Sequence, residues 1–205
     1  MKLHWSPRSP FVRKVMIVLY EAGIEHQVTC VRTPVAMDKP NLDLMPDNPL
    51  SKLPTLVLDD GTAIYDSRVI CAYLDGVAGA GLLPAEPRAR LIAERRQALG
   101  DGFLDTLLLY RQERNKPQER QTPAWLSAFG LKAKAVVAAL EKEAPELETT
   151  PFDLGLISIG CALSYLDYRF ADLPWRDGHP ALAAWHLRFN ERPSVVRSQP
   201  DDAAA

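Results

Sequence analysis

The stretch that decides the fold is PDNPLSKLPTLVLDDGTAIYDSRVI, residues 46–70. Within it, the apolar run Thr55–Leu58 follows Leu53-Pro54 and predicts a β-strand. The Asp-Asp-Gly sequence at 59–61 is typical of a hairpin turn, so residues 63–64 are expected to return as the paired strand. The stretch therefore predicts a strand hairpin that is introduced by a proline.

Asp66 and Ser67 are expected to open the helix that follows this hairpin. The N–H groups of a first helical turn and the positive end of the helix dipole favour an anion, and the Ser67 hydroxyl adds a donor. The carboxylate of Asp66 can bind an ammonium group at the same place. This helix start is therefore suited to hold both charges of an α-amino acid.

The composition is that of a folded globular protein. The chain has 205 residues and a mass of 22.8 kDa, enough for one large domain or two small ones. Hydrophobic residues make up 47% and charged residues 24%, which are ordinary values. The net charge is −2 and there is no basic stretch, so we expect no nucleic-acid partner.

The cysteine and histidine patterns point to a cytoplasmic protein without a metal. Cys30, Cys71 and Cys161 are far apart and form no CxxC motif, which favours a reducing compartment over a disulfide framework. No run approaches the roughly 18 continuous apolar residues of a membrane span, and the N-terminus has no signal-peptide pattern. Without such an apolar run we expect no membrane partner. The four histidines have neither i, i+4 spacing nor a neighbouring cysteine, so we also expect no metal site.

The first 78 residues predict alternating strands and helices. Further strands are expected at 1–5 and 26–31, a helix at 10–21, and a short, proline-bounded helix at 38–46. The full order is then strand, helix, strand, helix, strand, strand, helix. This order predicts a thioredoxin-like sheet, in which the bond before Pro54 is expected to be cis.

Residues 76–84, GVAGAGLLP, are typical of a linker, and only helical patterns follow them. Residues 150–153, Thr-Pro-Phe-Asp, predict a capping box in its Asp form, with Pro151 at the first helical position. We therefore expect a thioredoxin-like domain at 1–78, an all-helical domain at 84–200 and a disordered tail at 201–205. The helices are expected at 88–114, 124–143, 154–168, where the helix is apolar enough to be interior, and 180–192.

These features resemble the glutathione S-transferase superfamily. In that family, the residue before a cis-proline pairs its backbone with the cysteine of glutathione, and an acidic residue followed by Ser holds the γ-glutamyl end. Leu53-Pro54 and Asp66-Ser67 match these positions and their order. The small α/β domain followed by a helical domain also matches the plan of the family.

Three more fragments carry the resemblance: SPFVRKV at residues 9–15, the apolar helix opened by Thr150 and Asp153, and RPSVVRSQP at residues 192–200. The chain is most similar to small bacterial members that begin with a Ser-Pro-Phe motif. The resemblance implies glutathione as cosubstrate and a homodimer.

Ser9 is the candidate catalytic residue, because the family works by stabilising the thiolate of bound glutathione. A thiol pKa is ~8.5, and lowering it by about 2 needs roughly 2.7 kcal/mol. A hydrogen bond from the Ser9 hydroxyl and the N-terminus of the helix that starts at Pro10 are suited to supply this. Alternatively, Ser9 is only the N-cap of that helix, although one hydroxyl can fill both roles. Ser6 is the substitute in the same loop.

Two departures from related groups narrow the chemistry. The omega and beta groups have Cys at the position of Ser9 and use it in mixed disulfides, so its absence here favours conjugation over thiol transfer. The N-terminal catalytic Tyr of the larger eukaryotic classes is also unmatched, since the first tyrosine is Tyr20.

Other candidate residues carry a weaker signal. Lys39 and Lys52 are possible partners of the glycine carboxylate of glutathione, although each also suits a solvated surface. Asp101 and Asp105 are expected on a solvated face, with contact to glutathione or a dimer partner as the alternative. A pocket for the second substrate is expected from residues that also suit a plain core, namely Trp5, Phe103, Leu107, Tyr110 and Arg111.

The resemblance implies a glutathione transferase-like enzyme that activates the glutathione thiol for attack on an apolar electrophile, as in detoxification. One alternative is a glutathione-dependent isomerase or dehalogenase, which would use the same thiolate. Another is a non-catalytic binding protein, because fold does not dictate function. The Leu-Pro and Asp-Ser pairs argue against the last, since a scaffold needs no clamp for a γ-glutamyl group.

Overall fold

The computed structural model describes residues 1–200, and the chain divides into two compact units. The N-terminal unit contains residues 1–90 and 193–200, and the helical unit contains residues 91–192. We expected the first domain to end at residue 78 and residues 193–200 to belong to the helical domain. In the structure the boundary lies inside a long helix, and the last described residues return to the N-terminal unit.

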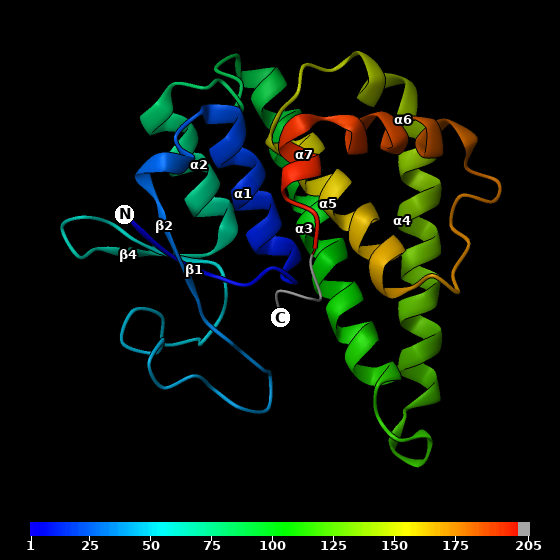
Figure 1. Ribbon diagram of the computed structural model, residues 1–205. Coiled ribbons are helices and arrows are strands. Elements are labelled where there is room, and N and C mark those ends of the chain that lie inside the picture. Colours follow the sequence, from blue (N-terminus) through cyan, green and yellow to red (C-terminus); the bar gives the residue numbers. More distant parts are fainter. Residues whose placement is uncertain (201–205) are drawn as a thin grey trace. The chain divides into compact units, whose positions relative to one another are not determined.

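The N-terminal unit is built on a mixed four-stranded sheet (Figure 1). Its strands have the order β2-β1-β3-β4. Strand β1 pairs with β2 in parallel and with β3 antiparallel, and β3 pairs with β4 antiparallel. This arrangement confirms the predicted thioredoxin-like sheet. The bounds are β1 (Lys2–Trp5), β2 (Thr29–Arg32), β3 (Thr55–Val57) and β4 (Ala63–Ile64).

Helices α1 (Pro10–Ala22) and α2 (Ser67–Ala78) pack against each other in this unit (Figure 1). Gly23 is the C-cap of helix α1, and its φ of +67° lies in the left-handed region that glycine adopts without strain. On α2, Ile70 and Leu74 are fully buried, whereas Val69 and Tyr73 are exposed. The apolar positions predicted for α2 are therefore divided between the core and the surface.

The helix predicted at residues 38–46 is wrong, because this segment forms turns. The side-chain oxygen of Asn41 accepts the N–H groups of Asp43 and Leu44, at 3.0 and 3.2 Å. Such side-chain bonds offer the backbone an alternative to a helix. The second predicted strand also starts later, at Thr29, because a short 3-10 helix, η1 (Glu25–Gln27), precedes it.

The helical unit is close to its predicted form, with one helix longer than expected. The predicted helix at 124–143 continues to Thr149 with Pro145 inside it. The predicted interior helix at 154–168 is confirmed, since all of its residues from 154 to 166 are buried. The elements are α3 (Pro87–Arg114), η2 (Gln118–Arg120), α4 (Pro123–Thr149), α5 (Leu154–Arg169) and α6 (Pro180–Glu191).

The capping box predicted for α5 is wrong in its register. Asp153 is the N-cap, and its carboxylate accepts the N–H of Leu156 at 2.8 Å. Thr150 instead ends α4, where its hydroxyl donates to the carbonyl of Glu146 at 2.7 Å. Pro151 consequently lies between the two helices. Burial of the Asp153 carboxyl raises its pKa, although the Leu156 N–H acts in the opposite direction.

Two glycines allow other helices to approach α5 closely. A Cβ atom at Gly160 would lie 2.2 Å from the ring of Phe189 on α6. A Cβ atom at Gly100 on α3 would lie 2.5 Å from the backbone of Ser158 on α5. These distances are far below van der Waals contact, so any side chain at either position would force the helices apart.

The short helix α7 (Pro193–Arg197) packs on α1 in the N-terminal unit. The hydroxyl of Ser194 donates to the carboxylate of Glu21 at 2.5 Å. The Arg197 guanidinium lies 3.9 Å from the ring centroid of Tyr20 and 3.2 Å from the carboxylate of Glu25. Val195 is fully buried. Helix α7 therefore contributes to the core of the first unit.

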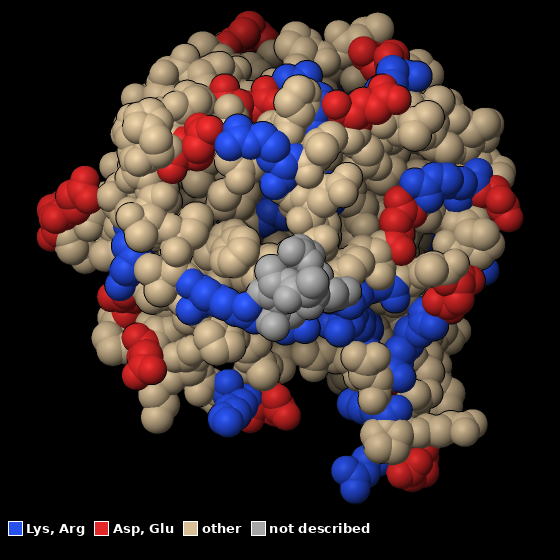
Figure 2. Space-filling view, in the orientation of Figure 1, with Lys and Arg blue, Asp and Glu red and all other residues tan. Residues whose placement is uncertain are grey.

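Side chains of both signs are distributed over the face of the molecule that Figure 2 shows. Helix α4 contains an 18-residue window with a mean hydropathy of 1.2, of which 17% is buried. By length and composition this helix could cross a membrane. The same test is passed by helices of soluble proteins, so it is a weak indication.

Candidate functional site

The predicted binding residues come together at one end of the sheet. His4 of β1 pairs with Thr55 of β3, so Leu53-Pro54 lies beside the end of β1, where the loop leading to Ser9 begins. In the next ladder, Leu56 of β3 pairs with Ile64 of β4, so Asp66 follows β4 at that same end. The register therefore brings Ser9, Leu53 and Asp66 to one edge of one unit.

Ser9 is the N-cap of α1, as its position before Pro10 predicted. Its hydroxyl oxygen accepts the N–H of Val12 at 3.3 Å, and the side chain is half-buried. Because a hydroxyl carries one proton and two lone pairs, this bond leaves the proton of Ser9 for another acceptor. The Ser6 hydroxyl, the substitute candidate, accepts the N–H of Arg8 at 3.4 Å.

The Leu53-Pro54 peptide bond is cis, which confirms the prediction. Both residues are buried, and Leu53 packs with Val12 and Leu44 in an apolar cluster that also includes Trp5. Within the described residues, the backbone of Leu53 forms no hydrogen bond. Its N–H and C=O groups are therefore suited to pair with the backbone of a peptide ligand.

Asp66 is the N-cap of α2, and its Oδ1 atom accepts the N–H of Arg68 at 2.9 Å. Asp66 is exposed, whereas Ser67 is almost completely buried. The predicted arrangement is thus present, with a carboxylate at the surface and a serine in the first turn of a twelve-residue helix. A carboxylate can accept several hydrogen bonds, so the bond from Arg68 does not exhaust it.

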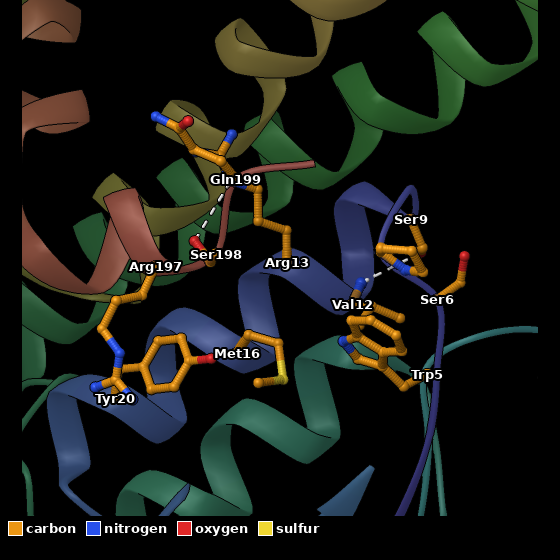
Figure 3. A pocket seen from close by; sticks show the side chains of 11 residues that line it. Trp5, Ser6, Ser9, Val12, Arg13, Met16, Tyr20, Arg197, Ser198 and Gln199 are labelled. Atoms are coloured by element: carbon orange, nitrogen blue, oxygen red, sulfur yellow. Dashed lines mark hydrogen bonds between the residues drawn. The ribbon is translucent and has the colours of Figure 1, made fainter. Parts of the chain in front are cut away.

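A cavity of about 60 Å³ runs from this site along α1 (Figure 3). Trp5, Ser6 and Ser9 line one part, and Tyr20 and Arg197 line another, with Met16 between them in the view. Burial raises the pKa of the Tyr20 hydroxyl, so this phenol stays protonated at neutral pH. The complete lining is Trp5, Ser6, Pro7, Ser9, Val12, Arg13, Met16, Tyr20, Arg197, Ser198 and Gln199.

Several of these lining residues were not predicted. Positions 9, 13, 16 and 20 follow helical spacing, so they share one face of α1, and this pattern could have been found. The contribution of residues 197–199 has no local signal, because it depends on the return of α7 to the first unit. Arg13 links α1 to α7, since its Nη2 atom donates to the carbonyl of Val195 at 3.4 Å.

A partly buried polar network fixes the loop before Leu53. The Nε2 atom of His4 lies 2.8 Å from the Asp47 carboxylate, its Nδ1 atom lies 2.8 Å from the Thr33 hydroxyl, and Lys2 donates to Asp47 at 2.9 Å. The hydrogen bond from Lys2 and the one from His4 hold the pKa of Asp47 below its usual range. No sequence motif predicted this network, which ties β1 to the turns that precede the cis-proline.

The two lysines suggested for the glycine carboxylate both lie on exposed, non-regular segments. Lys39 follows β2 in the turn region, and Lys52 directly precedes Leu53. The carbonyl of Lys52 accepts bonds from Asn48 and from the Thr55 hydroxyl, at 3.2 and 2.9 Å. This places the start of the Lys52 side chain next to the cis-proline and makes it the better anchored of the two.

The residues suggested for a second-substrate pocket have different surroundings. Trp5 lines the α1 cavity, whereas Phe103 and Leu107 of α3 are buried, as their alternative interpretation as core predicted. The ring of Tyr110 lies 5.2 Å from that of Phe170, and the half-buried Arg111 is hydrogen-bonded to Tyr165.

The two aspartates of α3 also differ from each other. Asp101 is buried, so the expectation of a solvated face is wrong for it, whereas Asp105 is exposed. Across residues 1–200, no group of three or more His, Cys, Asp or Glu side chains is placed to hold a metal ion.

The family model and the relatives that match this chain agree in their descriptions. Residues 8–77 match the family model described as "Glutathione S-transferase, N-terminal domain". The "Uncharacterized GST-like protein YibF" of Escherichia coli K12 is 32% identical over 207 residues, spanning 99% of this chain and 100% of that protein. A glutathione transferase family member from Pseudomonas fluorescens Pf-5, crystallised with bound glutathione, is 40% identical with a TM-score of 0.94 over 98% of each chain. A second crystal structure from that organism, with bound S-(propanoic acid)-glutathione, is 39% identical with a TM-score of 0.88 over 98% of this chain and 100% of that one.

A thioredoxin-like unit joined to a helical unit, with a cis-proline and an acidic helix start at one end of the sheet, defines the glutathione transferase class of proteins. The full-length similarity to YibF and to the Pseudomonas proteins agrees with this class. The chain belongs to the glutathione S-transferase family.

Proposed function

We propose that this protein binds glutathione at the end of its sheet and activates the thiol for attack on an electrophilic carbon atom. The observation that carries the proposal is the convergence of Ser9, the cis Leu53-Pro54 peptide and the Asp66 helix start on one edge of the N-terminal unit. The glutathione bound to the Pseudomonas relative supports it.

Each end of the tripeptide has a matching group at this edge. The Leu53 backbone pairs with the cysteine residue, and the Asp66 carboxylate binds the α-ammonium of the γ-glutamyl group. The α-carboxylate of that group takes the N–H groups of the first turn of α2 and the Ser67 hydroxyl. Lys52 or Lys39, in the segment between β2 and β3, binds the glycine carboxylate.

Ser9 activates the thiol by donating its hydroxyl proton to the sulfur atom. Because the N–H of Val12 already occupies one lone pair of the Ser9 oxygen, the hydroxyl is oriented before glutathione binds. The N-terminus of α1 adds a positive potential at the same place. Both interactions are stronger with the thiolate than with the thiol, so they lower the thiol pKa.

In the reaction, the thiol releases its proton to solvent and the thiolate forms a carbon–sulfur bond. The electron pair displaced at carbon leaves with a leaving group or moves into an adjacent π-system. The S-(propanoic acid)-glutathione bound to the second Pseudomonas structure is a thioether of this kind, which supports conjugation. An isomerase or dehalogenase would use the same thiolate. The cavity along α1, beside Trp5, would receive an apolar electrophile.

We infer that the protein is a homodimer that works in the cytoplasm, without nucleic-acid or membrane partners. An exposed apolar stripe supports the dimer, since Val69, Tyr73 and Val77 are four residues apart on α2 and are 50%, 37% and 55% exposed. Covering such a stripe with a second copy would remove apolar surface from water.

Titration of the thiolate absorbance of bound glutathione tests the proposed activation. In Ser9→Ala, the thiol pKa should rise and the turnover of an aryl halide should fall, while glutathione affinity stays nearly constant. Activity should not vanish, because the N–H groups of α1 remain. Since the variant also loses a helix cap, Ser9→Gly is the control, as glycine costs only a few tenths of a kcal/mol at an N-cap.

An unchanged pKa and rate in both variants would mean that Ser9 is only a cap. Absence of glutathione binding to the wild-type protein would instead remove the proposed function as a whole.

A further inference from the structure

The helical unit contains a cavity of about 180 Å³ that the proposed glutathione chemistry does not use. It lies where the end of α4, the start of α5 and helix α6 meet. Trp185 and Phe189 form its buried side and are 6% and 4% exposed, and the half-buried Phe152 forms another wall. Every residue that lines it belongs to the helical unit.

The lining of this cavity favours a flat aromatic ring. The Trp185 and Phe189 rings are stacked with centroids 5.6 Å apart, and the Phe152 and Phe189 rings are 6.2 Å apart. A third ring placed against such surfaces gains both apolar burial and ring–ring contact. An apolar cavity of roughly 150 Å³ in a protein interior holds benzene, so this cavity has room for one six-membered ring with a small substituent.

The mouth of the cavity favours a negative charge on that substituent. The Arg192 guanidinium lies 3.8 Å from the ring centroid of Phe152, and Arg188 forms an ion pair with Glu148. The lining thus carries two positive side chains and one negative side chain. A guanidinium has five N–H donors in a plane, which suits a carboxylate even where one donor is already used.

We propose that this cavity is a second ligand site, separate from the glutathione site, that binds single-ring aromatic carboxylates of the benzoate type. The ring packs against Phe152, Trp185 and Phe189, and the carboxylate takes hydrogen bonds from Arg192 at the mouth. This assignment does not depend on the proposed enzymatic function, because none of the lining residues belongs to the N-terminal unit.

The experiment is calorimetric titration of the full-length protein with benzoate, with and without saturating glutathione. We expect one saturable site per chain whose affinity glutathione does not change. Benzyl alcohol, which lacks the charge, and cyclohexanecarboxylate, which lacks the planar ring, should each bind at least about tenfold more weakly.

Variants assign the binding to this cavity. Arg192→Gln should weaken benzoate binding about tenfold, and Arg188→Gln should weaken it as well, because it leaves the Glu148 charge uncompensated. Arg120→Gln, at an exposed arginine of η2 in the same unit, is the matched control and should bind like the wild type. Trp185→Phe should keep the calorimetric signal but lose the quenching of tryptophan fluorescence that benzoate causes.

Several results would overturn the proposal: no saturable binding, competition by glutathione, equal binding of cyclohexanecarboxylate, or the same loss in Arg120→Gln as in Arg192→Gln. Circular dichroism of each variant identifies any that fails to fold. If Arg192→Gln does not fold, Arg188→Gln decides, and unchanged binding in that variant counts against the site.

Discussion

The hydroxyl of Ser9 accepts one hydrogen bond from its own helix, which leaves its proton for a different partner. Asp66 is similar, because one of its oxygen atoms caps α2 while the carboxylate charge is available to a ligand. At both positions, the side chain that begins the helix is also the proposed binding group. The local rule that predicts a cap and the functional rule that predicts a site therefore select the same residue.

Asp66→Asn separates the charge of this side chain from its capping role. Asparagine still accepts the Arg68 N–H and still caps the helix, so stability should hardly change. Loss of the counter-charge to the γ-glutamyl ammonium should weaken glutathione binding by roughly 1–2 kcal/mol, about tenfold. Calorimetry measures the dissociation constant, with Asp60→Asn in the exposed hairpin turn as the control. Equal affinity in Asp66→Asn and the wild type would refute the assignment.

Individual residues were predictable where the physical rule is local. The N-caps at Asp66 and Ser9 each follow from the immediate neighbours in the sequence, whereas the cis bond at Pro54 was expected from the order of strands and helices. The N-cap of α5 was misassigned to Thr150, because Thr150 and Asp153 are both good caps and only the end of α4 decides between them. Where two neighbouring residues are both suited to be an N-cap, only the tertiary structure decides which of them starts the helix.

Among the elements, the turns before β3 depend on polar anchors rather than on helix formation. Asn41 and Asp47 hold this segment by side-chain hydrogen bonds, which a search for helical periodicity does not detect. Because these hydrogen bonds leave no periodic pattern in the sequence, the segment at 38–46 was wrongly predicted as a helix. The strands were easier to predict, because a short apolar run between turn residues is typical of a strand.

Asp47→Asn should remove a pH-dependent part of the stability. The pKa of Asp47 is lowered from 3.8 by Lys2 and His4, so the charged form stabilises the fold above pH 3.8, and this contribution is lost as the pH falls through the lowered value. Because Lys2 and Asp47 are both partly exposed, the contribution should stay below about 1 kcal/mol. Urea unfolding at pH 7 and at acidic pH measures it. The wild type should be the more stable protein at pH 7 and should lose that advantage in acid. If the difference in the free energy of unfolding between the wild type and Asp47→Asn stayed the same at both pH values, this account would be contradicted.

Gly160→Ala should destabilise the contact between α5 and α6. The added methyl group would lie 2.2 Å from the Phe189 ring, and overpacking of this kind costs about 1–3 kcal/mol. Thermal unfolding followed by circular dichroism measures the effect. Gly102→Ala is the matched control, because a Cβ atom there meets no neighbour within 4 Å and alanine favours a helix. A Gly160→Ala protein as stable as the wild type would show that the helices separate at little cost.

At the scale of the whole molecule, Tyr73→Glu tests the proposed homodimer. A charge in the middle of the Val69–Val77 stripe would have to be buried on association, which should weaken the dimer at least about tenfold. Sedimentation velocity over a range of concentrations measures this change. Val31→Glu places the same charge at another exposed apolar position of the N-terminal unit and should leave association unchanged. A monomeric wild-type protein would exclude the dimer.

The two-part plan was predictable because the glycine-rich linker separates strand patterns from helical patterns. The membership of residues 193–200 was not predictable, since a five-residue helix carries too short a pattern to show which unit it packs on. Its partners on α1, Tyr20 and Glu21, are more than 170 positions away in the chain.

This return of α7 has a consequence for synthesis. The ribosome produces α1 before the helical unit and α7 after it, so the N-terminal unit cannot be completed until the whole helical unit has been made. Until then, the face of α1 that α7 will cover, beside Tyr20, is exposed to solvent and to chaperones. A nascent chain that stops before residue 193 would consequently present an unfinished first unit, whatever the state of its helical unit.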